Sequence, residues 1–161
     1  MDTSTAFAVP KDRQIVTVRL SRSIAIEGEI FLETISDGLS IHQKVTAFLE
    51  NSNVFFPVKS VTGGGTEFIH KQRVRAIEVL FPKDPETNYF SHMHMHMIPI
   101  TAFFNDGDSI SGDLMAEVPQ EKARLSDCLN LPNKFLDVKA GNKMCYINKE
   151  ALQKVVYNEK K

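Results

Sequence analysis

The sequence predicts a mainly β (α+β) protein, built as a tandem duplication of a β-β-α-β-β-β unit that forms small antiparallel sheets or partly closed barrels. Three observations carry this prediction: an internal repeat, segments in which apolar and polar residues alternate, and one short helical pattern in each half. Alternation with period two is typical of half-buried strands, whereas apolar residues three and four apart share one face of a helix. Short strands joined by tight turns favour antiparallel pairing.

The internal repeat matches the first half of the chain to the second. Thr17 matches Thr101 and Gly28 matches Gly112, and FIHKQRVRAIEV falls on YINKEALQKVVY after small changes of loop length. Further matched pairs are Glu33 with Glu117, Leu49 with Leu129, Asn53 with Asn133, Phe55 with Phe135, Val58 with Val138, Ile69 with Ile147 and Lys71 with Lys149. Self-similarity of this kind indicates a repeated architecture.

The elements of the first unit follow from its local patterns. Alternating apolar residues predict strands in VTVRL and in IAIEGEI, and HQKVTAFLEN carries apolar residues at helical spacing. VFFPVKSV and EFIH flank three glycines and are predicted as a hairpin, and VRAIEVL is predicted as a last strand after a turn near Lys71. The second unit repeats this order, with its helix expected in KARLSDCLNL.

The repeat divides the chain into five segments. They are a flexible N-terminal segment (1–13), a first unit (14–81), a linker and strand extension (82–97), a second unit (98–157) and a tail (158–161). The linker begins with FPKDPETNYFSH, whose prolines and polar residues are typical of a connection between units.

Composition and charge restrict the possible functions. Nineteen basic and twenty acidic side chains give a formal net charge of −1, which lacks the basic excess of a dedicated nucleic-acid binder. No stretch approaches the roughly 18 apolar residues of a membrane span, and the first residues lack a secretory signal pattern. Cys128 and Cys145 have no metal-binding or redox spacing and are expected to be buried free thiols. We therefore expect a soluble cytoplasmic protein.

The stretch SHMHMHMIPITAFF is the one segment that suggests metal chemistry. On a strand His92, His94 and His96 share one face, with neighbours about 6.6 Å apart. A His-x-His pair can hold zinc only with a third ligand. The available third ligands are a carboxylate, His42, His70, Cys128 or Cys145. Because the histidines lie on the linker side of the repeat, we expect a structural strand extension without a cofactor, with zinc or another transition metal as the alternative.

Methionines of the same stretch lie on the opposite face of that strand. Met93, Met95 and Met97 would form an outward stripe close to Tyr89 and Phe90. Exposed contiguous apolar surface usually marks a contact with another domain or chain. These five residues are therefore the candidate interaction surface.

The second unit also resembles a known pattern. RLSDCLNLPNKFLDV and YINKEAL, within Arg124 to Leu152, are similar to the signature of an uncharacterised bacterial family of small domains with an LSD-LN…F…V…NK pattern. The first unit departs from it, with Thr46 and Ala47 at the Ser-Asp positions and His70 at the Asn position. The resemblance implies no activity. NDGDSISGDL is also similar to the first hairpin of Sm-like and SH3-like barrels, where a glycine on the second strand permits sharp bending.

Two main classes of function remain. The favoured one is a non-catalytic protein-interaction or scaffold module that binds a protein partner or a second copy of itself. The alternative is an Sm-like nucleic-acid-binding protein in which Lys59, Lys71, Arg73 and Arg75 contact phosphates. A metal-binding protein using the histidine strand comes third. No enzyme is expected, because the sequence has no nucleophile motif and no phosphate-binding loop.

Overall fold

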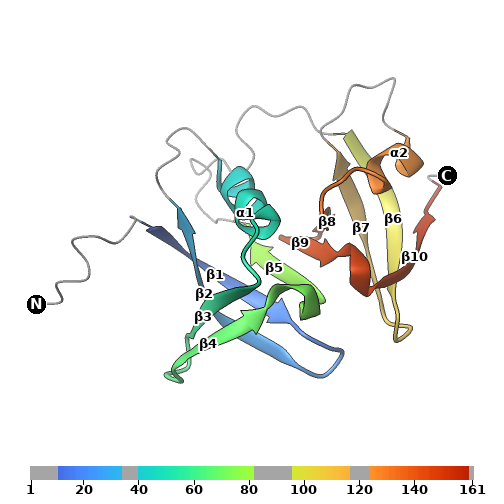
Figure 1. Ribbon diagram of the computed structural model, residues 1–161. Coiled ribbons are helices and arrows are strands. Elements are labelled where there is room, and N and C mark those ends of the chain that lie inside the picture. Colours follow the sequence, from blue (N-terminus) through green and yellow to red (C-terminus); the bar gives the residue numbers. More distant parts are fainter. Residues whose placement is uncertain (1–10, 34–39, 82–95, 117–123, 160–161) are drawn as a thin grey trace, which may run out of the picture.

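The computed structural model of the chain describes residues 11–33, 40–81, 96–116 and 124–159. Most of the predicted N-terminal segment and linker, and the last residues of the predicted tail, lie outside these ranges. The described residues form ten strands and two short helices, so the prediction of a mainly β protein is confirmed. Figure 1 shows how these elements are arranged.

The elements occur in the same order in the two halves of the chain. The first half contains β1 (Lys11–Arg19), β2 (Ala25–Glu33), α1 (Ile41–Glu50), β3 (Phe55–Ser60), β4 (Thr66–His70), a 3₁₀ turn (Lys71–Arg73) and β5 (Ala76–Leu80). The second contains β6 (His96–Phe104), β7 (Ser109–Ala116), α2 (Leu125–Leu129), β8 (Phe135–Ala140), β9 (Lys143–Asn148), a 3₁₀ turn (Lys149–Ala151) and β10 (Leu152–Tyr157). The first strand begins at Lys11 and the last described strand ends at Tyr157.

All ten strands belong to one antiparallel sheet with the order β10-β6-β7-β8-β9-β5-β1-β2-β3-β4. Each half contributes five neighbouring strands, and the halves meet where β5 pairs with β9, from Ala76↔Ile147 to Leu80↔Lys143. We call this pairing the central junction. The described sheet is not closed, and β4 and β10 lie at its two opposite ends (Figure 1).

The first helix has a complete start signal. The Ser40 side chain accepts a hydrogen bond from the Gln43 backbone, and the Gln43 side chain accepts one from the Ser40 backbone, which is a capping box. The buried face of α1 consists of His42, Val45 and Leu49. In the described part of the chain, no helix combines the length and the apolar character needed to cross a bilayer.

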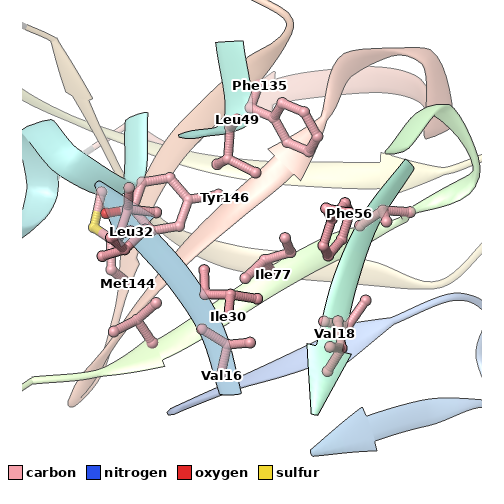
Figure 2. Close-up of a cluster of buried hydrophobic side chains, with 14 of the residues drawn as sticks. Val16, Val18, Ile30, Leu32, Leu49, Phe56, Ile77, Phe135, Met144 and Tyr146 are labelled. Atoms are coloured by element: carbon pink, nitrogen blue, oxygen red, sulfur yellow. The ribbon is translucent and has the colours of Figure 1, made fainter. Parts of the chain in front are cut away.

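Two apolar cores lie against the sheet, and each contains residues from both halves. Figure 2 shows Phe135, Met144 and Tyr146 of the second half packed among first-half residues such as Leu49 and Ile77. The other core contains the alternating buried residues of β6, which are Ile98, Ile100, Ala102 and Phe104, together with Ala76 of β5. The burial of alternate residues on β6 confirms the predicted strand pattern. The central junction is therefore buried on both of its faces.

Two glycines allow close approach of neighbouring strands. A Cβ on Gly28 would lie 2.5 Å from Val58 Cγ1 and 2.6 Å from the carbonyl oxygen of Lys59. A Cβ on Gly112 of β7 would collide in the same way with the carbonyl oxygen of Lys139 on β8. Since a side chain has no space at either position, glycine is required where β2 crosses β3 and where β7 crosses β8.

Candidate protein-interaction surface

An aromatic patch lies on the outer hairpin formed by β3 and β4. In this hairpin Phe55 pairs with His70 and Pro57 pairs with Phe68, so the four side chains share one face. Phe55 is 53% exposed and Phe68 is 68% exposed, and the Phe55 ring meets the His70 ring edge to face with centroids 4.9 Å apart. We call Phe55, Pro57, Phe68 and His70 the edge aromatic patch. Large aromatic side chains left in water at a sheet edge are typical of a binding surface.

The opposite end of the sheet also exposes apolar side chains. On β10, Val156 and Tyr157 are exposed, and the Lys154 ammonium lies 4.8 Å from the centre of the Phe103 ring. Within the described residues β10 pairs only with β6 and β4 pairs only with β3. Each end strand therefore has one edge whose backbone groups have no strand partner among the described residues.

The residues that the sequence singled out for interaction and metal binding lie mostly outside the described ranges. Tyr89, Phe90, Met93, Met95, His92 and His94 all belong to this undescribed group. Met97 is described, and its side chain is 42% exposed on β6, as the face assignment predicted. His96 is half-buried at the start of β6, opposite Ala116. Among the described side chains, no group of three or more potential ligands could hold a metal ion.

The four basic residues of the nucleic-acid alternative differ in their accessibility. Lys59 and Arg73 are exposed, but Lys71 and Arg75 are buried. The Arg75 guanidinium pairs with the Asp106 carboxylate and lies 4.0 Å from the centre of the Phe104 ring. Arg75 therefore joins β5 to the loop after β6 in this arrangement.

The two lysines matched by the repeat have the same kind of partners. The Lys71 ammonium donates to the carbonyl oxygens of Phe48 and Asn51 and to Asn51 Oδ1, at the end of α1. The Lys149 ammonium donates to the carbonyl oxygen of Leu131 and to Asn133 Oδ1, in the loop after α2. Burial lowers the pKa of both ammonium groups. These contacts assign both lysines to holding the loop that follows each helix.

A cavity of about 390 Å³ lies where these two lysine turns approach each other. It is lined by residues 52–54, 71–72, 132–135 and 148–150. The described lining has no paired carboxylates and no activated nucleophile. It therefore gives no specific indication of catalysis.

A buried polar cluster connects α1 to the second half across the central junction. His42 Nδ1 lies 2.9 Å from the Tyr146 hydroxyl, and His42 Nε2 lies 3.4 Å from Asp137 Oδ2. Burial lowers the pKa of His42 to about 4, while burial and the nearby Glu50 carboxylate raise the pKa of Asp137 to about 7. Neither His42 nor Asp137 lines the cavity. The contacts of His42 with Asp137 and Tyr146 therefore hold α1 against β8 and β9.

Glu50 connects α1 to the backbone of the second half. Its carboxylate accepts hydrogen bonds from the backbone N–H groups of Lys134 and Phe135, at 2.8–3.2 Å. Along the junction itself, the Glu78 carboxylate accepts from Arg19 at 2.8 Å and from Lys143 at 3.0 Å. The Glu50 bonds and the Lys143–Glu78 bond connect the two halves, whereas the Arg19–Glu78 bond lies within the first half.

A signal for the edge aromatic patch is present in the sequence. In VFFPV, period two places Phe55 and Pro57 on the face opposite Phe56 and Val58. Phe56 and Val58 are buried in the core, so the other face had to be either exposed or covered by a partner. Comparison with known proteins gives no independent assignment, because no protein family model, no curated protein and no solved structure matches this chain.

Proposed function

We propose that the protein is a non-catalytic interaction or scaffold module that self-associates through the edge aromatic patch. One observation carries the proposal. Phe55 and Phe68 are strongly exposed, whereas the residues matched to them by the repeat, Phe135 and Tyr146, are 3% and 0% exposed in the core that the two halves share. The same surface is therefore covered in one half of the chain and uncovered in the other.

The proposal includes a tandem duplication, and the strand registers support it. Val18 pairs with Ile77 in the first half, and the matched residues Ala102 and Val155 pair in the second. Further pairs that correspond are Pro57↔Phe68 with Asp137↔Tyr146, Val58↔Glu67 with Val138↔Cys145, and Glu29↔Lys59 with Asp113↔Lys139. The crowded positions of Gly28 and Gly112 correspond as well.

Covering the patch would contribute favourably to the free energy of association. Fully burying one phenylalanine side chain contributes about 1.5–3 kcal/mol, and the patch contains two such side chains. Met97 on β6 is a second exposed apolar residue that a partner could cover. Cys128 and Cys145 are free and buried, which is common in proteins of the reducing cytoplasm, the location we propose.

The proposal is tested by the mass of the protein in solution. We expect size-exclusion chromatography with light scattering to give a concentration-dependent mass above the 18.1 kDa of one chain. Replacing Phe55 and Phe68 together with serine should reduce the mass to that of one chain, because the apolar contact area is removed. Ile15→Ser is the matched control, since Ile15 is 57% exposed but lies on β1, inside the sheet.

A mass of one chain at every concentration would contradict self-association. A double variant that assembles like the wild type would show that the edge aromatic patch is not the contact surface.

A further inference from the structure

The central junction has a defined register and hydrogen-bond pattern. At this junction Tyr146 of β9 lies opposite Ile77 of β5. The Asn148 N–H donates to the Arg75 carbonyl, and hydrogen-bonded pairs alternate with non-bonded pairs in antiparallel strands. The Tyr146–Ile77 pair is therefore one of the pairs that exchange backbone hydrogen bonds.

The two end strands of the sheet are the repeat counterparts of these junction strands. FIHKQRVRAIEV falls on YINKEALQKVVY, which matches β4 to β9 and β5 to β10. In particular, Phe68 corresponds to Tyr146, and Val155 corresponds to Ile77. Because β9 pairs with β5, this correspondence predicts that β4 pairs with a β10. Within the described part of one chain, β4 and β10 do not pair with each other.

The hydrogen-bond phase of β4 suits this pairing. The Lys71 N–H donates to the Val54 carbonyl, so alternation makes Phe68 and Pro57 a non-bonded pair. Pro57 has no N–H to donate, which agrees with this phase. The N–H and C=O of Phe68, and those of Thr66 two residues earlier, therefore point to the free edge of the sheet.

The hydrogen-bond phase of β10 also suits it. The Asn158 N–H donates to the Pro99 carbonyl of β6. Counting back from that bonded pair, Tyr157 and Val155 belong to non-bonded pairs with β6. Their N–H and C=O groups therefore also point to a free edge.

We infer that β4 of one copy adds to β10 of a second copy in the register of the central junction, with Phe68 opposite Val155 and Thr66 opposite Tyr157. This inference rests on the proposed self-association and specifies its geometry. Phe68 then lies beside Val155 as Tyr146 lies beside Ile77, and the backbone groups of both free edges are paired. The charges also agree, because Glu67 of one copy lies diagonal to Lys154 of the next, within reach of long side chains.

The contact joins two different surfaces of the same chain. Each copy that uses its β4 still has a free β10, and each copy that uses its β10 still has a free β4. Such a head-to-tail contact produces a closed ring or an open chain of copies and differs from a symmetric dimer. This property gives the inference a test that a symmetric dimer would fail.

The test uses one variant blocked at each edge. Thr66→Pro removes an N–H that points to the free edge of β4, and Tyr157→Pro does the same on β10, without removing a hydrogen bond inside the sheet. By light scattering, each variant alone should have the mass of one chain. An equimolar mixture should give a complex of two chains, because one variant retains β10 and the other retains β4. Thr66→Val and Tyr157→Phe, which keep the N–H, are the matched controls and should assemble.

The outcomes separate this inference from the proposed function. Blocked variants that still assemble, or a mixture that remains monomeric while the controls assemble, would overturn the head-to-tail pairing and leave self-association standing. A wild-type protein that is monomeric at all concentrations would overturn both.

A second measurement is independent of the proline variants. Glu67 lies opposite Val156 in the inferred register, in a non-bonded pair whose Cα atoms are about 4.5 Å apart. Mixing Glu67→Cys with Val156→Cys and oxidising should give a cross-linked heterodimer. Glu67→Cys mixed with Tyr157→Cys should not, because Tyr157 lies on the other face of the strand. The native thiols of Cys128 and Cys145 are buried and do not compete. Equal cross-linking of both mixtures, or of neither, would contradict the register.

Discussion

Replacing Gly28 with alanine is expected to lower the free energy of unfolding by about 3 kcal/mol, the upper end for overpacking a core. The added Cβ would lie 2.6 Å from the Lys59 carbonyl oxygen, and this backbone atom cannot rotate away as a side chain can. β2 and β3 would have to separate, which would also disturb the core around Val58. Urea denaturation monitored by circular dichroism measures the change.

Gly65 provides the matched control, because a Cβ at that position meets no atom within 4 Å. Gly65→Ala should change the free energy of unfolding by less than about 1 kcal/mol. Gly112→Ala should behave like Gly28→Ala, since its Cβ would meet the Lys139 carbonyl oxygen. A Gly28→Ala protein as stable as the wild type would show that β2 and β3 do not approach as closely as described.

Replacing Asp137 with asparagine is expected to make stability strongly dependent on pH. In the wild type, burial raises the pKa of Asp137 from 3.8 to about 7, so the folded state binds more protons there and this contribution to stability falls as pH rises. Burial lowers the pKa of His42 from 6.5 to about 4, so the folded state binds fewer protons there and this contribution rises with pH. The two contributions oppose each other between about pH 4 and 6.5.

Asparagine resembles the protonated carboxyl in shape but does not titrate. In Asp137→Asn, the contribution of His42 is no longer opposed by that of Asp137. The difference in the free energy of unfolding between the variant and the wild type should therefore increase by up to about 3 kcal/mol from pH 4 to 6.5. His42→Gln should give the opposite slope, with stability falling as pH rises to about 7. Urea denaturation at several pH values measures these profiles. Taking the difference between each variant and the wild type cancels the pH dependence of the groups that the two proteins share. Parallel profiles for the three proteins would contradict the buried pair.

The sequence predicted the strands best where one face is buried and the other is not. On β6 the alternation from Ile98 to Phe104 is reproduced residue by residue. The short helix α1 was predictable from the spacing of Val45 and Leu49. The second helix is shorter than its pattern and begins only at Leu125, after a residue whose side chain makes no cap.

The central junction was harder to predict, although its signal was present. Met144 to Ile147 is a continuous apolar run that is buried throughout. Ala76 to Val79 is also buried throughout, but it contains the charged Glu78 and is not a continuous apolar run. Continuous apolar runs indicate strands covered on both faces. Sequence patterns do not specify which strand pairs with which, so the pairing of these two strands required the structure.

The polar residues of the junction could not be assigned from the sequence. His42 was a candidate third metal ligand because of its residue type. In the structure it lies beside Asp137 and Tyr146, which are distant from His42 in the sequence. The exposure of Phe55 was also ambiguous, because its repeat counterpart Phe135 is buried. The same residue type has opposite environments because the first half pairs with β9 in the second half, whereas β4 has no such neighbour among the described residues.

Amide hydrogen exchange as a function of protein concentration tests the central claim most directly. The N–H groups of Thr66, Phe68, Val155 and Tyr157 point to free edges in one chain and should exchange rapidly in dilute protein. In concentrated protein they should become protected together, because β4 of one copy pairs with β10 of the next. The N–H groups of Ile77 and Tyr146 should keep the same protection at every concentration. Exchange at these four edge positions that does not change with concentration, or that changes on β4 but not on β10, would contradict the account.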